Sequence, residues 1–231
     1  MARRMALGFN QDAFRQVCSF ALIRSQLATD GNQPSRVLMI GDGYGFLGAL
    51  LKQAYPRLQV TFVDLGKTLL FQAFHCQCGF PDHQHSSVLD AGDRRATSDF
   101  VYCPAEHLDR LSGRFDVAVN IASMQEMKRE SVDEYFAFMR RQEVALFYCA
   151  NRERKVLVGG ETRNFSEYPW SPADKHLVDE LCPWHRWYLA YPGSESGPRI
   201  FGLRAPLVSA FDGPHRHRLT RLAPGDGTVG G

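Results

Sequence analysis

The sequence predicts an α/β fold of the Rossmann-like kind, in which a mostly parallel central sheet is flanked by helices. A short aliphatic run at residues 36–40 ends in the glycine-rich segment 41–45, and a segment of helical character follows it. Further apolar runs alternate with helical segments, which is the pattern of β–α–β units with right-handed crossovers. With 231 residues, 44% of them hydrophobic and 23% charged, the chain can bury one sizeable core.

In the first part of the chain, helices and strands are predicted to alternate. Phe14, Val17 and Leu22 recur at helical spacing, and the polar segment 29–34 ends that pattern. Pro56 ends the helix after the glycines, because proline cannot donate a helical hydrogen bond. The expected elements, in order, are a helix at 9–28, a strand at 36–40, a helix at 46–55, a strand at 58–63 and a helix at 66–75.

In the second part, shorter strands surround one further helix. Val132, Tyr135 and Met139 share one face of that helix. The polar segment 81–98 has no clear period and predicts loops. The expected elements are strands at 100–102 and 115–120, a helix at 131–140 and a strand at 144–149.

The last third of the chain is predicted to be less regular. Residues 161–195 are rich in aromatics and proline, which suits an irregular region on the substrate side, and residues 199–203 suit a closing strand. Glycine, proline, arginine and histidine dominate residues 212–231, which predicts a disordered tail. We therefore expect a single domain over residues 1–211.

Composition and charge narrow the class of protein. The formal net charge is +2, which gives no case for nucleic acid or an anionic membrane as partner. No apolar run approaches the ~18 residues of a membrane span, and the basic start of the chain lacks the apolar core of a secretory signal. The six cysteines have no regular spacing and fit reduced thiols better than a disulfide scaffold. We expect a cytoplasmic enzyme.

The glycine-rich segment predicts a site for a nucleotide-like ligand. Glycine suits a sharp strand-to-helix turn because it adopts positive φ and lets a ligand approach the backbone. Asp64 ends the next strand, about twenty residues on, where a carboxylate can accept hydrogen bonds from ribose hydroxyls. The alternative is a plain turn with a surface aspartate.

The spacing of the glycines bears on which cofactor binds. A dinucleotide fingerprint has glycine or alanine at its third position, where this chain has the bulky Phe46. The G-x-G-x-G spacing at residues 41–45 is similar to that of S-adenosylmethionine-dependent methyltransferases and favours a methyl donor over NAD. Such enzymes often carry an acid two positions before the first glycine, and this chain has Met39 there.

Several motifs together resemble a family of sugar O-methyltransferases within the class I S-adenosylmethionine-dependent methyltransferase superfamily. The matching segments lie in the family's order between residues 36 and 170: I-G-D-G-Y-G at 40–45, F-V-D-L at 62–65, V-x-x-N-x-x-S-M-Q-E-M at 117–127, F-Y-C-A-N-R at 147–152 and Y-P-W at 168–170. Two departures are Gly66, where the family has proline, and a short region before the glycines. The resemblance implies a class I methyltransferase fold and methylation of a hydroxyl on a sugar-containing small molecule or polysaccharide.

The resemblance also implies roles for particular residues. Glu126 is expected to act as the base that removes the hydroxyl proton, with Ser123 or Asn120 orienting substrate or cofactor. Glu106 is expected near the adenine. The residues expected to bind S-adenosylmethionine are Gly41, Gly43, Tyr44, Gly45, Asp64, Leu65, Glu106 and Asn120. The alternatives are that Glu126 caps or salt-bridges the following helix and that Glu106 is a plain surface residue.

Other signals keep different functions open. Cys76, Cys78, His83 and His85 are of the types that bind zinc, but their spacing is atypical and an ordinary helix end with a polar loop fits them better, so no metal is expected. The aromatics that could stack on a sugar or pack in the core are Trp170, Trp184, Trp187, Tyr188 and Tyr191. A methyltransferase for another small molecule and a non-catalytic cofactor-binding protein are the alternative functions.

Overall fold

A computed structural model describes residues 1–8, 10–31, 33–90, 95–184, 199–200, 203–204 and 213–225. Its centre is an eight-stranded sheet with the strand order β3-β4-β2-β1-β5-β6-β12-β9. The strands from β3 to β6 run parallel to their neighbours, whereas β12 pairs antiparallel with both β6 and β9. The predicted α/β fold with a mostly parallel sheet is confirmed.

The first part of the chain follows the predicted alternation closely. The elements are α1 (Gln11–Thr29), β1 (Arg36–Ile40), α2 (Phe46–Ala54), β2 (Gln59–Asp64), α3 (Gly66–Gly79), β3 (His85–Ser87) and β4 (Phe100–Pro104). The short strand β3 lies in the segment for which the sequence predicts only loops. α3 runs four residues beyond its predicted end at residue 75, as far as Gly79.

The second part adds the remaining strands of the sheet. The elements are β5 (Val117–Ile121), α4 (Arg129–Arg141), β6 (Leu146–Arg152), β7 (Arg154–Val156), β8 (Thr162–Asn164), β9 (Lys175–Leu181), β10 (Arg199–Ile200), β11 (Leu203–Arg204) and β12 (His215–Arg221). Short 3-10 helices at Ala105–Arg110 and Met124–Glu126 follow β4 and β5. None of the described helices is both long and apolar enough to cross a membrane.

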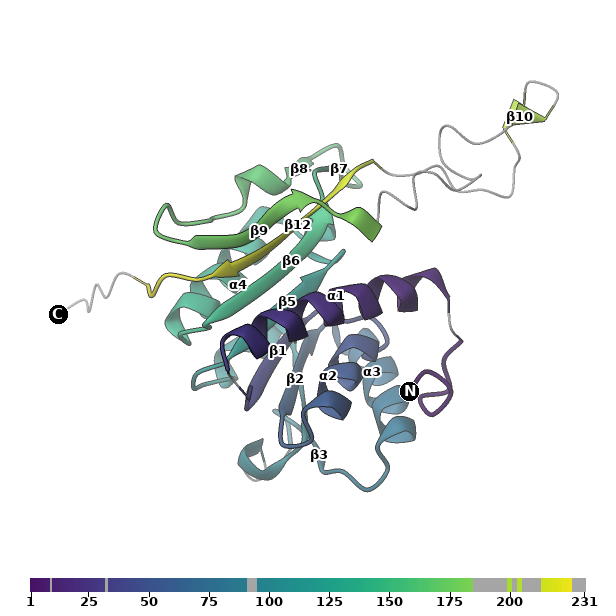
Figure 1. Ribbon diagram of the computed structural model, residues 1–231, viewed down its shortest axis with the longest axis vertical. Helices are drawn as coiled ribbons and strands as arrows, with labels where there is room; N and C mark the ends of the chain where they lie inside the picture. The colour runs from purple at the N-terminus through teal and green to yellow at the C-terminus, as the bar shows by residue number, and fades with distance from the viewer. Residues whose placement is uncertain are drawn as a thin grey trace.

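Alternate residues of the strands face two layers of helices. Val37 and Met39 of β1 belong to the core that includes residues of α1, α2 and α3. Leu38 and Ile40 of the same strand belong to the core on the other face, which includes residues of α4. Figure 1 shows α1, α2 and α3 on the near side of the sheet. This three-layer arrangement leaves the carboxyl ends of the parallel strands as the open edge.

The predicted disordered tail is wrong for residues 215–221, which form β12 inside the sheet, so the domain extends beyond residue 211. His217 and Leu219 are buried in alternation along this strand. The intervening Arg216 and Arg218 pair with Asp179 of β9 at 2.9 and 2.6 Å. The sequence of this segment looks like a solvent-exposed run, because the residues that bury it and balance its charges lie on another strand. Residues 226–231 lie outside the described part.

The predictions for residues 161–203 also need correction. Residues 162–164 and 175–181 are strands, and β9 forms an edge of the central sheet. The predicted closing strand at 199–203 is wrong, because β10 and β11 pair only with each other in the described residues. Residues 185–198 lie outside the described part.

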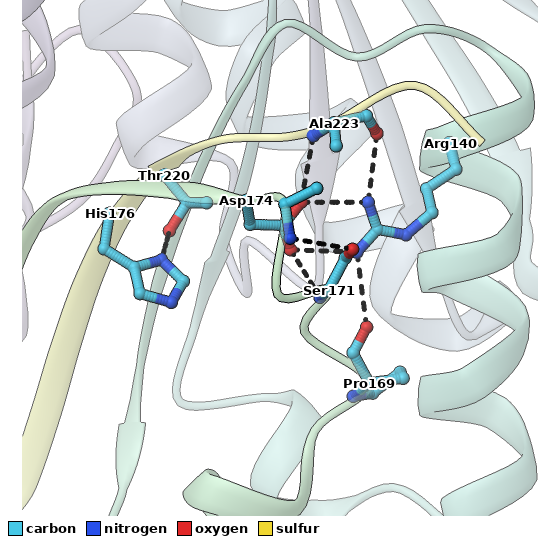
Figure 2. A network of polar contacts seen from close by, with 8 residues as sticks. Arg140, Pro169, Ser171, Asp174, His176, Thr220 and Ala223 are labelled. Atoms are coloured by element: carbon cyan, nitrogen blue, oxygen red, sulfur yellow. Dashed lines mark hydrogen bonds and ion pairs between the residues drawn. The ribbon is translucent and has the colours of Figure 1, made fainter. Parts of the chain in front are cut away.

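A polar network joins α4 to the segment before β9 and to the residues after β12 (Figure 2). The Arg140 guanidinium donates to both carboxylate oxygens of Asp174, at 3.0 and 2.9 Å, and to the carbonyl oxygens of Pro169 and Ala223. Asp174 also accepts hydrogen bonds from the backbone N–H groups of Ser171 and Ala223. The network therefore holds together three segments that are distant in the chain.

Candidate active site

The glycine turn lies at the carboxyl end of β1, where the strand order reverses between β1 and β5. Gly41 and Gly43 have φ of +70° and +58°, a region that disfavours residues with a side chain. A Cβ on Gly41 would stand 2.5 Å from Ser123 Cβ, whereas a Cβ on Gly43 would meet nothing within 4 Å. The lack of a side chain at Gly41 therefore lets the loop after β5 pack closely against the turn. The lack of one at Gly43 leaves open space beside the turn.

Asp42 holds the turn to the start of α2. Its Oδ2 accepts a hydrogen bond from the Gly48 N–H at 2.8 Å. Burial raises the pKa of Asp42 to about 8 against the effect of that hydrogen bond, and the negative charges of Asp12 and Asp64 also raise it. The turn therefore places an acid of unusual proton affinity at the centre of the candidate site.

Two cavities meet beside this turn. A cavity of about 310 Å³ lies between the glycine turn, the end of β5 and α1. A cavity of about 610 Å³ lies between the end of β2, the 3-10 helices and α4. Both are lined by Gly41, Asp64, Ala122 and Ser123. The two cavities therefore adjoin at these shared residues, at the carboxyl edge of the sheet.

Asp64 stands at the junction of the cavities. Its Oδ1 accepts a hydrogen bond from the Leu65 N–H at 2.8 Å, and its Oδ2 accepts one from Gln72 Nε2 at 2.7 Å. Burial raises its pKa, and these two hydrogen bonds oppose the change. The carboxylate is thus fixed in orientation while it borders both cavities, as a partner for ribose hydroxyls requires.

The structure brings most of the predicted site residues together. Gly41, Gly43 and Asp64 line the smaller cavity, while the larger one is lined by Gly41, Asp64, Leu65, Glu106, Ser123 and Glu126. Gly45 is buried just before α2. The Tyr44 ring is 54% exposed and contacts the rings of Phe71 and His75 of α3. Tyr44 and Gly45 do not line either cavity.

Asn120, for which the sequence predicts a contact with the cofactor, does not line either cavity. The residue is fully buried, and its Nδ2 donates to the Ile40 carbonyl at 2.9 Å and to Ser123 Oγ. Its Oδ1 accepts from Asn151 Nδ2 at 2.8 Å. These bonds tie β1, β5 and β6 together. The amide therefore fixes Ser123, whose hydroxyl also donates to the Ile40 carbonyl.

Glu126 borders the larger cavity and is half exposed. Its carboxylate lies 3.4 Å from Lys155 Nζ and 3.9 Å from Arg152 Nη1, and it accepts from Gln125 Nε2 at 3.2 Å. The predicted alternative of an ion pair is thus present, although the partners come from β6 and β7 and not from the following helix. The same contacts hold the carboxylate at the mouth of the site.

α1 contributes three residues that sequence reasoning missed. Asp12, Arg15 and Gln16 line the smaller cavity from above the glycine turn. Asp12 forms an ion pair with Arg15 and accepts from Gln16 Nε2 at 2.8 Å. Their spacing of three and four residues places them on one helix face. The sequence signal that could have indicated them is this set of polar residues at helical spacing, on a helix that is otherwise recognised by its apolar residues.

His85 and Trp170, which the sequence marks as candidates for a metal site and a sugar site, serve the packing of the domain. Both ring nitrogens of His85 have partners, in the Tyr102 hydroxyl and the Phe80 carbonyl. In the described ranges, no group of three or more histidines, cysteines or acids is placed to hold a metal ion. Trp170 packs on Phe136 and Phe147 in the core, so its position does not favour stacking on a sugar. Trp184 likewise packs on the His217 ring of β12, and the candidates at 187, 188 and 191 lie outside the described residues.

The strand order, the glycine turn at the carboxyl end of β1 and the paired cavities define a Rossmann-like fold of the class I methyltransferase type. The magnesium protoporphyrin IX methyltransferase from Synechocystis PCC 6803, solved with bound S-adenosylmethionine, has this fold. It is 12% identical at a TM-score of 0.51 over 91% of this chain and 80% of that one. Its structure with bound S-adenosylhomocysteine also has a TM-score of 0.51, at 14% identity over 91% and 84%.

The sequence similarity to a curated protein covers only part of the chain. The malonyl-[acyl-carrier protein] O-methyltransferase of Geobacter sulfurreducens is 31% identical over 119 residues, which are 52% of this chain and 38% of that protein. The chain therefore spans well under half the length of this curated relative. No model of a protein family matches the chain. Together these likenesses support the class I methyltransferase superfamily, and they do not extend to the predicted sugar acceptor.

Proposed function

We propose that the protein is an S-adenosylmethionine-dependent O-methyltransferase. The adjoining pair of cavities beside the glycine turn carries this proposal. The larger cavity has apolar walls that include Val63, Leu108 and Met127, which suit an adenine ring. Asp64 at the junction suits the ribose, and the charged smaller cavity suits the amino-acid end of the cofactor. The residues present therefore fit the cofactor in one orientation.

The cofactor contacts follow from this orientation. We expect Gly41 and Gly43 to admit the cofactor to the backbone and Asp64 to accept from the ribose hydroxyls. Leu65 and Glu106 would border the adenosine. Tyr44, Gly45 and Asn120 would support the site by holding the turn and Ser123 in place, as their hydrogen bonds and packing allow.

When bound, the cofactor supplies an electrophilic methyl group on a sulfonium sulfur. The protein has to hold an acceptor oxygen in line with that methyl, because orientation supplies much of the rate. Ser123 lines both cavities at their junction and is proposed to orient the acceptor or the cofactor. Glu126 is proposed to take the proton of an acceptor hydroxyl, from the position where Lys155 and Arg152 hold it.

Two acceptor classes are proposed. A hydroxyl of a sugar-containing molecule follows from the resemblance of residues 117–127 to sugar O-methyltransferases. A carboxylate is the second candidate, because the Geobacter relative is by name an enzyme acting on a malonyl group. A carboxylate oxygen carries no proton at neutral pH and needs no base. The two classes therefore differ in whether Glu126 is required.

The proposed function is tested by calorimetric titration of the whole chain with S-adenosylhomocysteine. One-to-one binding is expected. The absence of binding at about 1 mM ligand, a concentration at which an interaction worth about 4 kcal/mol would be seen, would contradict the proposal. An assay of methyl transfer from labelled cofactor to glycosides and to malonyl-carrier protein then separates the two acceptor classes.

Replacing Glu126 with glutamine is expected to lower kcat/KM for a hydroxyl acceptor by about 10² to 10⁴-fold, because the amide cannot accept the proton. The affinity for S-adenosylhomocysteine should stay unchanged. Glu130→Gln is the matched control, since Glu130 is an exposed acid in the first turn of α4. Full turnover of a hydroxyl acceptor by the Glu126→Gln variant would remove Glu126 from the catalytic role.

A further inference from the structure

We propose that the Asp12–Arg15 pair of α1 binds the amino-acid end of the cofactor, with Arg15 on its carboxylate and Asp12 on its ammonium group. The inference rests on the proposed function, because it assigns residues to the S-adenosylmethionine that this function requires. It assigns a binding role to a helix that neither the glycine turn nor the resemblance indicates.

The first turn of α1 is fixed in place over the glycine turn. The Asn10 side chain accepts a hydrogen bond from the Ala13 N–H at 2.9 Å and so caps the helix. Further along, Ile23 is fully buried, and Ser19 Oγ lies 3.1 Å from the Tyr148 hydroxyl of β6. The cap and these contacts hold one helix face toward the smaller cavity. Asp12 and Arg15 are on that face and line the cavity.

The smaller cavity needs a carboxylate for the ammonium group, and position 39 does not supply one. Met39 is 1% exposed and packs in the core on the α1 side of the sheet. Asp42 also lines this cavity, but its Oδ2 accepts from the Gly48 N–H of α2 and burial raises its pKa to about 8, which makes it the weaker partner for an ammonium group at neutral pH. The hydrogen-bond partners of Asp12 belong to its own helix turn, so its carboxylate can turn to a ligand without loss of packing. Asp12 therefore replaces the missing acid at position 39.

Arg15 is the matching cation for the carboxylate. Its side chain is 21% exposed where it lines the cavity. A guanidinium can bind a carboxylate through two parallel hydrogen bonds, which is a strong and geometrically specific contact. In the structure, Arg15 and Asp12 pair with each other. A bound zwitterion would place its carboxylate beside Arg15 and its ammonium group beside Asp12, so the two opposite charges are already side by side before the cofactor binds.

A carboxylate of the acceptor could bind Arg15 in place of the carboxylate of the cofactor. The following titrations distinguish these two possibilities. S-adenosylhomocysteine and 5′-methylthioadenosine are each titrated into the wild-type protein and the Arg15→Gln variant. Methylthioadenosine lacks the amino-acid end. We expect Arg15→Gln to weaken binding of S-adenosylhomocysteine by about 10- to 100-fold, the effect of one lost charge-assisted contact, and to leave methylthioadenosine unchanged. Asp12→Asn should weaken S-adenosylhomocysteine selectively as well.

Arg24→Gln is the control, because Arg24 is an exposed arginine of the same helix and undergoes the same change of charge. Thermal unfolding checks that each variant is folded. If Arg15→Gln left the affinity for S-adenosylhomocysteine unchanged and raised the KM for the acceptor, the inference would be overturned. Arg15 would then bind a carboxylate of the acceptor. Equal weakening of both ligands would overturn it too. If the wild-type protein bound neither ligand, the proposed function itself would fail, which is a distinct result.

Discussion

Replacing Arg140 with methionine is expected to lower the free energy of unfolding by about 3 to 5 kcal/mol, because it leaves a buried carboxylate without its cation. The Asp174 side chain is fully buried and that of Arg140 is 17% exposed. Burial alone would raise the pKa of Asp174, but the hydrogen bonds from Arg140, Ala223 and Ser171 hold it below its ordinary value. Figure 2 shows how these residues converge on one carboxylate.

Urea denaturation of the variant near neutral pH measures this loss. Arg129→Met is the matched control, because Arg129 lies on the same helix but pairs with Asp133 at 3.9 Å in an exposed position, and it should change stability by less than about 1 kcal/mol. Similar losses in the two variants would contradict a special role for the network. Since the pKa of Asp174 is lowered, its contribution is present at neutral pH and is lost as the pH falls through that pKa.

Asp42→Asn is expected to make the protein more stable at alkaline pH and to flatten its stability profile between pH 4 and 8. The pKa of Asp42 rises from 3.8 to about 8 on folding. Between these values the folded protein keeps a proton that the unfolded chain has released, so stability falls as the pH rises. The difference sets an upper bound of about 6 kcal/mol, and partial exposure reduces the expected gain to about 2 to 4 kcal/mol.

Urea denaturation of wild type and variant at pH 5.5 and 8.5 checks this expectation. The gain of the variant should be clearly smaller at the lower pH, because wild-type stability falls progressively between pH 3.8 and about 8 and less of that interval has been crossed at pH 5.5, while asparagine keeps an oxygen for the Gly48 N–H. Asp82→Asn, a change at an exposed aspartate, serves as the control. A stability difference that is the same at both pH values would show that ionisation of Asp42 is not linked to folding.

The elements around the glycine turn could be predicted because their signals are local. The observed bounds of β1, α2 and β2 differ from the predicted ranges by at most one residue. Periodicity, the glycines and Pro56 determine these elements within a few residues of where they act. Gly41, Asp64 and Ser123 could be found for the same reason, since each lies at or just beyond the end of a predicted strand.

The strands β9 and β12 could not be predicted from the same kind of signal. His217 is buried because it lies beside Trp184 and Tyr148, and Arg216 is neutralised by Asp179 and Glu153. These partners are distant in the chain, and in isolation the segment looks basic and solvated. Burial of a histidine or arginine depends on the partner that compensates it, which local composition does not contain.

By itself, the sequence determined the order of the β–α–β units and the place of the glycine turn, because both depend on neighbouring residues. Only the tertiary structure decided that Asn120 does not line the cavities, that Asp12 and Arg15 of α1 line the cavity beside the turn, and that residues 215–221 are a strand of the central sheet. Each of these depends on which surfaces pack together across the sheet. Such packing is set by long-range burial and charge pairing, and a single stretch of sequence does not encode it.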